Sequence, residues 1–450
     1  MLEHLESRAL SAFRNAAARV PAYQRILRQA GVQAGQIDSL EAFRTLPVLT
    51  KRTTFQCFEL NQLCTDGQLG QPGTVLTSSG HSGIFAFGVT DADAVEHTVK
   101  WIDNLLDRLF EVRSRRTLLI NCLPMGVKVP TRACTLAEVS VRADMAVGLM
   151  RSMASHFAQI ILIGEAAFIK HVLETGLTSG VVWQNHVVHV ILGEEPLAEN
   201  ARKYLGEILG HDLRRPENGI IFSSMGVAEI GLNLFFEVPP VAPLILLRRT
   251  LHDHSSLRNL VLGPTDVVPS LFTYDPQRIL VEFDGAGSLI LTTLDPHLRI
   301  PLIRYAPGDR GALVNLHPQI RPALEAHGLS WDLLHDIPII AIYGRGEHAQ
   351  SGDAPVYPEA VKEGIYRDSN LARLTTVNFR LISGAAAVEI RIQLSPGLKP
   401  NEEIEKGFWA AISNYVKTPF TVSCHEYEHF KGGMMLDYER KFRYIEDRDT

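Results

Sequence analysis

The hydrophobic pattern in the first half of the chain alternates between buried strands and helices. Continuous apolar runs occur at Thr117–Cys122, Gln159–Gly164 and Val187–Leu192, and Gly219–Phe222 is a shorter run of the same kind. Runs without polar alternation are typical of parallel strands that are covered on both faces. Helix-like segments such as Ala198–Leu209 separate them. This order predicts an α/β fold built around a parallel sheet.

Further elements are predicted before this unit. Residues 1–20 have an amphipathic helical pattern, Pro21–Ala30 is a second expected helix, and Asp91–Val112 has the apolar spacing of a third. Two short strands, Thr74–Thr77 and Ile84–Val89, flank a turn of small residues. The α/β unit is therefore expected to carry helices and a hairpin on its N-terminal side.

From about Leu244 to Val314 the pattern changes to β segments that are separated by turns. The segments are LILLRR, ILVEFDG, SLILTTLD and IPLIRY, and together they predict a barrel-like β subdomain. One more strand is expected at Asp336–Tyr343, directly before the run Gly344-Arg345-Gly346-Glu347. Gly-rich punctuation of this kind marks the best candidate for a domain boundary.

The residues beyond this boundary predict a small α+β domain. Helix-like segments (Glu359–Ile365 and Glu402–Tyr415) occur with strand-like segments (Thr376–Ile382 and Ala387–Gln393). A chain of 450 residues exceeds one typical core, so two domains are the expected arrangement. We assign residues 1–343 to a large N-terminal domain and residues 344–450 to a small C-terminal domain.

Composition and charge exclude several classes of function. The net charge is only -6 and there is no basic run, so nucleic acid is not an expected partner. The five cysteines are scattered and lack a CxxC pair, which favours reduced thiols over disulfides or a zinc knuckle. The sequence shows neither a signal peptide nor an apolar run long enough to span a bilayer. These features predict a soluble cytoplasmic protein without a membrane partner.

The most informative polar motif is PLIRYAPGDRG at Pro301–Gly311, where an apolar segment leads into Arg304 and then into Gly308 and Asp309. A carboxylate at the end of a strand can accept hydrogen bonds from two vicinal hydroxyls, as on a ribose, while the arginine neutralises a phosphate. The alternative is an ordinary turn after an edge strand, with Arg304 as a surface cation.

A second candidate is the turn Ser78–Gly83, in the context TSSGHSG. Small residues leave backbone N–H groups and hydroxyls free to surround an anion. The turn lacks the Lys-Ser/Thr ending of a P-loop, and no long helix follows it directly. A serine-rich hairpin turn without a ligand is the alternative interpretation.

Two further motifs follow predicted strands. Ser223–Glu229 comes directly after GIIF and ends in an acid, Glu229, that could hold Mg²⁺ together with substrate phosphates. It could equally be an acid in the first turn of a helix. In ILGEEP, Ile191–Pro196, the chain leaves a strand with a flat backbone that can lie against an adenine ring, although many such turns only start helices.

The C-terminal sequence Arg440-Lys441-Phe442-Arg443-Tyr444 is basic with interleaved aromatic residues. A basic cluster near a terminus is usually a solvated tail. The aromatic side chains of Phe442 and Tyr444 favour a docked segment instead.

The order of these motifs matters more than any one of them. A Ser/Gly loop near residue 80, GEEP near 195, SMGVAEIG near 226, RYAPGDRG near 306, GRGE near 345 and a terminal lysine form an ordered set. The set resembles the adenylate-forming superfamily of acyl-CoA synthetases and peptide-synthetase adenylation domains. The segment PAYQRILRQAGVQAGQIDSLEAFRTLPVLTK, which ends at Lys51, is similar to the opening of the phenylacetate-CoA ligase-like branch. The resemblance runs over nearly the whole chain.

The resemblance implies a role for each matching position. Ser78, Ser79, Gly80, His81, Ser82 and Gly83 would form the phosphate loop; Gly193, Glu195 and Pro196 would line the adenine, with Ser224, Met225 and Gly226 on its other side. Glu229 would bind Mg²⁺, Asp309 would hold the ribose hydroxyls, Arg345 would contact the nucleotide, and Lys441 would be the catalytic lysine on a mobile C-terminal domain.

The sequence departs from the family pattern in the phosphate loop. His81 stands where relatives carry threonine, and Ile84 and Phe85 follow the loop where relatives carry lysine and proline. Losing that lysine removes a cation from the β- and γ-phosphates. His81 replaces part of the charge if it is protonated, and otherwise it is a neutral imidazole at the mouth of the site.

Three other positions also depart from the family pattern. Met225 stands where relatives have a tyrosine, Glu347 replaces an aspartate at the hinge, and Asp353-Ala354-Pro355 replaces the usual loop on the route of the thiol. Two alternatives therefore stay open: an adenylate-forming enzyme with an amine or other non-thiol acceptor, and a non-catalytic nucleotide- or acyl-binding member of the fold.

The activity that the resemblance implies is ATP- and Mg²⁺-dependent activation of an aromatic or otherwise small carboxylic acid, followed by transfer to CoA or a phosphopantetheinyl acyl carrier protein. The acyl pocket is expected from the segments Leu123–Gly126, Arg132–Ala146 and Gly164–Phe168. Arg132, Arg142 and Lys128 could pair with a second acid group on the substrate, or lie on the surface. A homodimer is one candidate for the oligomeric state.

Overall fold

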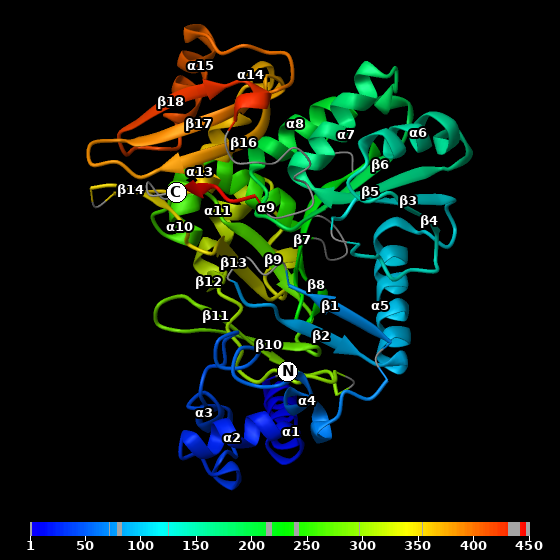
Figure 1. Cartoon of the computed structure of the whole chain (residues 1–450), viewed down its shortest axis with the longest axis vertical. Helices are drawn as coiled ribbons and strands as arrows, with labels where there is room; N and C mark the ends of the chain where they lie inside the picture. Colours follow the sequence, from blue (N-terminus) through cyan, green and yellow to red (C-terminus); the bar gives the residue numbers. More distant parts are fainter. Residues whose placement is uncertain are drawn as a thin grey trace.

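The structure is a computed structural model that describes residues 2–71, 73–78, 83–124, 126–212, 218–237, 243–296, 298–352, 354–430 and 442–446. Figure 1 shows helices of the N-terminal segment at the bottom, a large sheet with its helices in the middle, and the C-terminal strands at the top. We refer to the described residues up to 343 as the large domain, and to those from 344 onward as the C-terminal module.

A nine-stranded mixed sheet with the order β12-β13-β9-β8-β7-β6-β5-β3-β4 forms the centre of the large domain. Its strands are β3 (Thr117–Asn121), β4 (Thr135–Glu138), β5 (Gln159–Glu165), β6 (Val188–Gly193), β7 (Ile221–Val227), β8 (Gly231–Phe236), β9 (Ser270–Tyr274), β12 (Arg310–Val314) and β13 (Ile339–Gly344). The strands β4, β3, β5, β6 and β7 run parallel to one another. The pairs β7–β8, β8–β9, β9–β13 and β13–β12 are antiparallel. The sheet therefore changes character at β7.

The parallel half of the sheet is buried on both faces. Along β5, Ile160 and Leu162 belong to one hydrophobic cluster, whereas Ile161 and Ile163 belong to another. The first cluster contains residues of α6 (Ala143–Met153), α7 (Ala166–Thr178) and α8 (Glu199–Leu209), and the second contains one face of α5 (Ala92–Phe110). Two covered faces require apolar residues at consecutive positions. The predicted α/β fold with a parallel sheet is confirmed.

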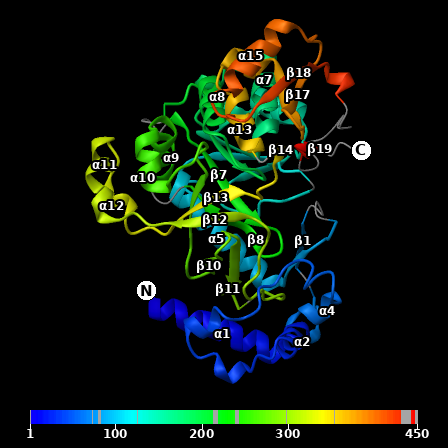
Figure 2. The same cartoon turned by 90° about the vertical axis from the view of Figure 1, so that its left-hand side faces the viewer.

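Further helices lie at the base and on one side of the large domain (Figure 2). The base is formed by α1 (Leu2–Arg19), α2 (Pro21–Gln29), α3 (Leu40–Phe43) and α4 (Leu60–Leu63). The side is formed by α9 (Pro243–Asp253), α10 (Ser255–Leu262), α11 (Arg321–Ala326) and α12 (Trp331–Leu334). Two antiparallel hairpins complete the domain: β1 (Thr74–Thr77) with β2 (Phe87–Thr90), and β10 (Ile279–Phe283) with β11 (Leu289–Thr293).

The strand expected at LILLRR is wrong, because this segment lies in α9. Leu244, Leu247 and Leu251 of that helix are fully buried, and their spacing of three and four residues is that of one helical face. A six-residue apolar run does not reveal this period by itself. The segment IPLIRY also forms no regular strand, since Tyr305 makes isolated bridges to Leu49 and Leu291.

The C-terminal module contains a four-stranded sheet with the order β18-β17-β16-β19. Its elements are β14 (Ala349–Ser351), β15 (Ala354–Val356), α13 (Pro358–Ile365), α14 (Ser369–Arg373), β16 (Thr375–Ile382), β17 (Val388–Leu394), α15 (Glu402–Ile412), β18 (Phe420–His425) and β19 (Ile445–Glu446). Val361 and Ile365 of α13 are in the same hydrophobic cluster as Leu205 of α8. One continuous apolar core therefore joins the module to the large domain.

Two other sequence-based expectations can be compared with the structure. All five cysteines are free thiols, as predicted. Within the described ranges, none of the helices is both long enough and apolar enough to cross a membrane.

Candidate active site

A cavity of about 380 Å³ lies where the ends of β6 and β7 meet the β1–β2 hairpin, α5 and the C-terminal module. Most of the residues that the sequence assigned to nucleotide binding line this cavity: Ser78, Gly193, Glu195, Pro196, Ser224, Met225, Gly226, Glu229, Asp309 and Arg345. Segments that are far apart in the sequence are therefore brought together at one place.

The remaining assigned residues fall into two groups. Gly83 is described, but it does not line the cavity. Ser79, Gly80, His81, Ser82 and Lys441 lie outside the described residues. The phosphate loop and the catalytic lysine therefore stay predictions from the sequence.

Glu229 lies in the turn between β7 and β8, and its side chain is only 3% exposed. The Tyr305 hydroxyl donates a hydrogen bond to Glu229 Oε1 at 2.7 Å, and Lys51 Nζ lies 3.0 Å from the same oxygen. Burial raises the pKa of Tyr305 well above its ordinary value, and the Glu229 carboxylate raises it further, so this hydroxyl stays protonated. We call Glu229, Lys51 and Tyr305 the Glu229 cluster.

Lys51, at the end of LPVLTK, has no site role among the sequence-based predictions. In the structure Lys51 lines the cavity and supplies a cation beside a carboxylate. The signal for this role was weak, because a single lysine after a turn is usually a surface residue.

The donor set at Glu229 fits a metal ion only when a ligand supplies further oxygens. Among the described residues no group of three or more His, Cys, Asp or Glu side chains could hold a metal. Mg²⁺ is usually bound through one or two carboxylates together with substrate phosphates. Glu229 can serve as such a carboxylate, with Lys51 and Tyr305 both held on Oε1.

Glu195 lies in the turn that follows β6 and forms a second cluster of the same composition. Its Oε2 accepts hydrogen bonds from Lys362 Nζ at 2.5 Å and from the Tyr444 hydroxyl at 2.8 Å. The Lys362 ammonium also lies 4.3 Å from the centre of the Tyr444 ring. Burial, followed by the Glu195 carboxylate, raises the pKa of Tyr444 well above its ordinary value. We call Glu195, Lys362 and Tyr444 the Glu195 cluster.

The local backbone explains how Glu195 reaches the cavity. The preceding residue, Glu194, has a φ of 72°, a conformation that is uncommon for a residue with a side chain. The Glu195 N–H donates to the carbonyl of Gly193 at 2.9 Å, which closes a tight turn at the end of β6. The interpretation of Phe442 and Tyr444 as a docked segment is confirmed, since both line the cavity.

Arg304 is in neither of the two expected places, beside a phosphate or on the surface. It is buried, with a φ of 50°, and its Nη1 donates to the carbonyl of Leu46 at 2.5 Å. Its Nε lies 3.4 Å from Glu282 Oε2. Arg304 therefore ties the N-terminal segment to β10, and it is neither a phosphate ligand nor a surface cation. Asp309, after Gly308 at a φ of 103°, does line the cavity.

One part of the cavity wall is apolar. Helix α5 contributes Ile102, Leu105, Leu106 and Leu109, which share one helical face. Other apolar lining residues are Leu123, Val127, Val129, Pro130, Ile163, Ile191, Phe222 and Phe236. The expected segment Leu123–Gly126 contributes Leu123 and Gly126, and the contribution of α5 was missed.

The other two expected acyl segments lie elsewhere. No residue of 132–146 or 164–168 lines the cavity. Arg132 pairs with Glu96 and Arg142 pairs with Asp144, with all four side chains largely exposed. These arginines are surface residues, which was the alternative that the sequence left open.

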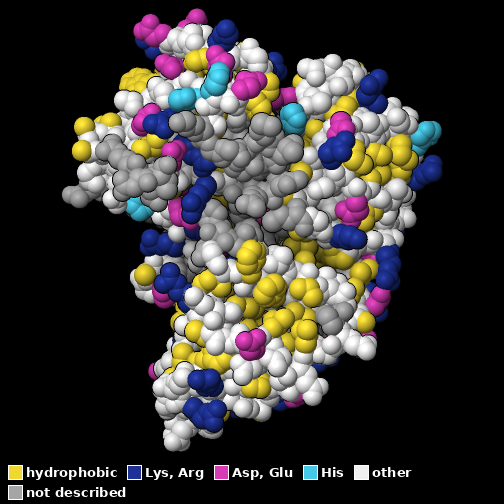
Figure 3. Space-filling model, in the orientation of Figure 1, with side chains coloured by type: hydrophobic (Ala, Val, Ile, Leu, Met, Phe, Trp, Pro, Cys, Tyr) yellow, Lys and Arg dark blue, Asp and Glu magenta, His cyan; other side chains and the backbone are white. Residues whose placement is uncertain are grey.

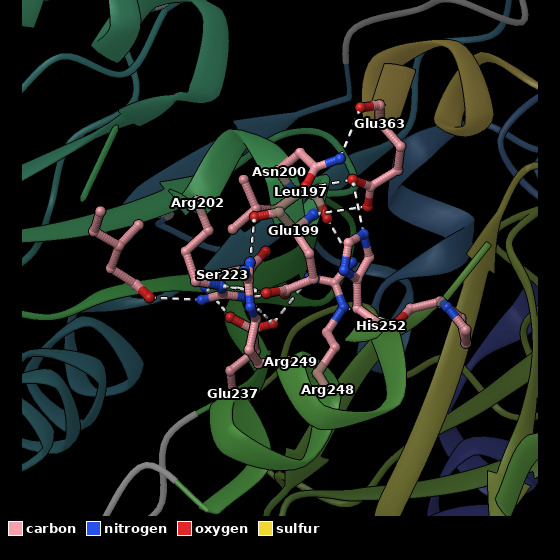
Figure 4. Close-up of polar contacts among 12 residues, drawn as sticks. Leu197, Glu199, Asn200, Arg202, Ser223, Glu237, Arg248, Arg249, His252 and Glu363 are labelled. Carbon is pink, nitrogen blue, oxygen red and sulfur yellow. Dashed lines mark hydrogen bonds and ion pairs between the residues drawn. The ribbon is translucent and has the colours of Figure 1, made fainter. Parts of the chain in front are cut away.

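A network of buried charges lies beside the start of β7 (Figure 4). Arg202 lies 2.8 Å from both Glu199 and Glu237, and Arg248 lies 2.9 Å from Glu199; each side chain is at most 2% exposed. Burial alone would raise the pKa of Glu199, but the two arginines lower it below its ordinary value. Glu237 Oε2 accepts a hydrogen bond from the Ser223 N–H at 2.6 Å. The network thus holds the strand from which Ser224 and Met225 reach the cavity.

The β1–β2 hairpin forms the outer edge of the site, and apolar side chains gather over its position in Figure 3. Val75 and Phe85 near this hairpin are 51% and 58% exposed. The hairpin lies close to the Glu229 turn, because a Cβ atom at Gly88 would come within 2.4 Å of the Ala228 carbonyl oxygen. Glycine at position 88 therefore allows this approach.

No family model and no curated protein matches the sequence. Solved structures match it in fold. The crystal structure of 2-hydroxyisobutyryl-CoA ligase in the postadenylation state in complex with R3-HIB-AMP has a TM-score of 0.69 at 13% identity, and the match covers 99% of this chain and 90% of that chain. The chain has the adenylate-forming enzyme fold.

Other structures of the same ligase match the chain in fold to different degrees. The postadenylation complex with 2-HIB-AMP has a TM-score of 0.68 at 13% identity, with coverage of 99% and 90% of the two chains. An open conformation in complex with 2-HIB-AMP and CoA has a TM-score of 0.56 at 13% identity, with coverage of 99% and 91%. The overlap in fold is thus greater with the two postadenylation structures than with the open conformation. At such low identity the likeness describes the fold and does not establish the activity.

Proposed function

We propose that this protein activates a carboxylic acid with ATP and Mg²⁺ and then transfers the acyl group to a thiol of CoA or of an acyl carrier protein. The acid would be aromatic or otherwise small, and the enzyme would be a ligase of the phenylacetate-CoA ligase-like branch. The observation that carries the proposal is the convergence of Ser78, Glu195, Glu229, Asp309 and Arg345 on one cavity.

The cavity has the two chemical halves that this reaction needs. Glu195, Asp309 and Arg345 form a polar part suited to a nucleotide. The face of α5 adds an apolar part suited to an aromatic or aliphatic acyl group. The first step would join the carboxylate oxygen to the α-phosphorus of ATP and break its bond to the β-phosphate oxygen, so that pyrophosphate leaves.

Positioning and positive charge supply most of the catalysis in phosphoryl chemistry. Lys51 already holds a positive charge at the cavity wall, beside Glu229. A bound Mg²⁺ would add charge neutralisation on the phosphates. Lys441 would contribute a further ammonium from the C-terminal module when that module is closed.

In the second step a thiol would attack the acyl carbon and AMP would leave. A second cavity of about 640 Å³ supports a separate entry for this acceptor, because it shares Pro196, Ile342, Glu359 and Lys362 with the first cavity. The acceptor class follows from the resemblance, and product analysis with CoA, carrier protein and amine present tests it.

The direct test of the first step is acid-dependent exchange of labelled pyrophosphate into ATP. A panel of aromatic and short aliphatic acids should contain at least one acid that supports exchange above the acid-free background. Absence of exchange across the panel, with ATP binding retained, contradicts the proposed activity.

The variant Lys441→Ala tests the assigned lysine. We expect exchange to fall by about 100-fold with ATP binding largely kept, because the ammonium would act on the developing charge. Lys406→Ala, which alters an exposed lysine of α15, is the control and should exchange as the wild type does. An unimpaired Lys441→Ala variant shows that this lysine is not the catalytic one.

A further inference from the structure

The Glu195 cluster joins the two parts of the molecule at the cavity wall. Glu195 belongs to the large domain, whereas Lys362 lies on α13 and Tyr444 lies just before β19. The side chains of Glu195 and Lys362 are 12% and 9% exposed. An ion pair that is this well buried depends on the geometry of both partners. This part of the wall is therefore complete only when the C-terminal module is docked.

Other contacts that hold the module in place lie outside the first cavity. Lys170 Nζ on α7 donates to the carbonyl of Thr375 at 2.8 Å, and Lys170 is 2% exposed. Glu363 accepts hydrogen bonds from the N–H groups of Glu199 and Asn200 at 2.7 and 3.0 Å. The shared apolar core adds to these contacts. The module therefore has several docking contacts that do not involve Lys362.

Lys362 instead donates a hydrogen bond to Glu195, whose carboxylate lines the first cavity. It lines both cavities, together with Pro196, and both hydrogen bonds of the cluster end on Glu195 Oε2. Two donors on one oxygen fix the rotamer of the carboxylate, and so fix the direction in which the other oxygen can accept an N–H group. A nucleobase with an exocyclic amino group offers such a donor.

We propose that Lys362 is a positioning residue for nucleotide binding, which couples docking of the C-terminal module to completion of the base-binding wall at Glu195. This inference rests on the proposed function, because it requires a nucleotide in the cavity. It gives the module a role that is separate from the delivery of Lys441. Nucleotide affinity then depends on the module even before any chemistry takes place.

The test compares two buried lysines of the same interface, Lys362→Met and Lys170→Met. The readouts are the Kd for ATP by calorimetry, and KM and kcat in pyrophosphate exchange with the best acid. We expect Lys362→Met to raise the Kd and KM for ATP by about tenfold and to change kcat by less than about threefold. Lys362→Arg should restore most of the affinity, because it keeps the positive charge.

Lys170→Met should loosen the module without changing the cavity wall. We expect faster hydrogen exchange in β16 for this variant and an unchanged Kd for ATP at temperatures at which both variants are folded. An equal loss of affinity in Lys170→Met and Lys362→Met would overturn the inference, because it would reduce Lys362 to a docking contact. An unchanged Kd in Lys362→Met would overturn it as well.

The same experiment separates this inference from the proposed function. Wild-type protein that neither binds ATP nor catalyses exchange contradicts the proposed function. Wild-type protein that does both, with unchanged affinity in Lys362→Met, contradicts only the inference. Should Lys362→Met not fold, Tyr444→Phe carries the test, because it removes one hydroxyl from the same cluster. It should raise the Kd about fivefold, and an unchanged Kd would count against the inference.

Discussion

Two glutamates on the cavity wall are held by the same kind of partners and yet differ in what they depend on. Glu229 and Glu195 each accept hydrogen bonds or an ion pair from one lysine and one tyrosine on a single oxygen. In the Glu229 cluster, Lys51 and Tyr305 both belong to the large domain. That cluster is therefore present wherever the large domain is folded.

The Glu195 cluster has the opposite dependence. Lys362 and Tyr444 both come from the C-terminal module, and Tyr444 is more than 240 positions away from Glu195 in the sequence. Two clusters with the same residue types thus differ in their dependence on the C-terminal module. The Glu229 cluster forms without the module, and the Glu195 cluster forms only when the module is docked. This comparison predicts that variants of the first cluster affect stability and turnover together, whereas variants of the second affect affinity for the nucleotide.

The largest effect is expected for Lys51→Met. Removing the ammonium leaves the Glu229 carboxylate, which is 3% exposed, without its charged partner. We expect the free energy of unfolding to fall by about 3 kcal/mol and kcat to fall by about 100-fold. Denaturant titration and pyrophosphate exchange measure the two quantities. A variant that changes only the KM for ATP would remove the distinction between the two clusters.

A smaller effect is expected for Glu363→Gln, which tests docking outside the first cavity. The Glu363 carboxylate accepts two N–H groups in the first turn of α8, where a negative charge is favourable. We expect docking of the module to weaken by about 1–2 kcal/mol, measured as faster hydrogen exchange in α13 and the first turn of α8. Glu402→Gln, on the exposed face of α15, is the matched control. Equal exchange rates in both variants would contradict this prediction.

The tyrosines provide the closest matched pair. Tyr305→Phe and Tyr444→Phe each remove one hydroxyl that donates to a glutamate, at 2.7 and 2.8 Å. Each should cost about 1 kcal/mol. We expect the loss in Tyr305→Phe to lower kcat and the loss in Tyr444→Phe to raise the KM for ATP. Steady-state kinetics on both variants will show whether the two effects separate in this way.

The smallest effect is a pH dependence of docking that arises from His252 on α9. Burial lowers the pKa of His252, but hydrogen bonding and attraction from Glu363 and from Asp253 outweigh this and raise it above its ordinary value. A raised folded pKa stabilises the protein below the unfolded value of about 6.5, and this contribution is lost as the pH rises through the folded value. Protection of α13 against hydrogen exchange should therefore decrease toward alkaline pH.

The variant His252→Gln should flatten this pH profile. Global stability should respond with the opposite sign, because burial lowers the pKa of His189 to about 3 and that of His211 to about 4. These two histidines are neutral in the folded protein, so stability is lost as the pH falls below about 6.5. If α13 and the whole protein were to show the same pH profile, His252 would have no separate role in docking.

Sequence patterns were sufficient to predict the secondary structure of segments whose neighbouring residues show a clear hydrophobic period. The strand β5 was predictable because both of its faces are buried, so Ile160 to Ile163 are all apolar. The helix α9 was not, because the run LILLRR is too short to separate a buried helix from a strand. In both cases the local period decided the outcome.

The residues of the candidate site also differ in whether a local motif reveals them. Glu195, Glu229 and Asp309 follow predicted strands and were found from motifs, and the structure brings all three to one cavity. Lys362 belongs to no motif, and its role depends on a contact with a residue 167 positions away. Arg304 was misassigned because its side chain is buried inside the protein, at a residue whose φ is positive. Long-range contacts and backbone direction are not readable from local patterns.

The apolar core that α8 shares with α13 has an energetic consequence for the proposed chemistry. Any opening of the C-terminal module must transfer Val361 and Ile365 from this core into water, at about 25 cal/mol for each Å² that is exposed. The open arrangement is therefore unfavourable unless an incoming molecule offsets that penalty. An acyl adenylate formed inside would be shielded from bulk water while the module stays docked, and binding of the acceptor would favour opening.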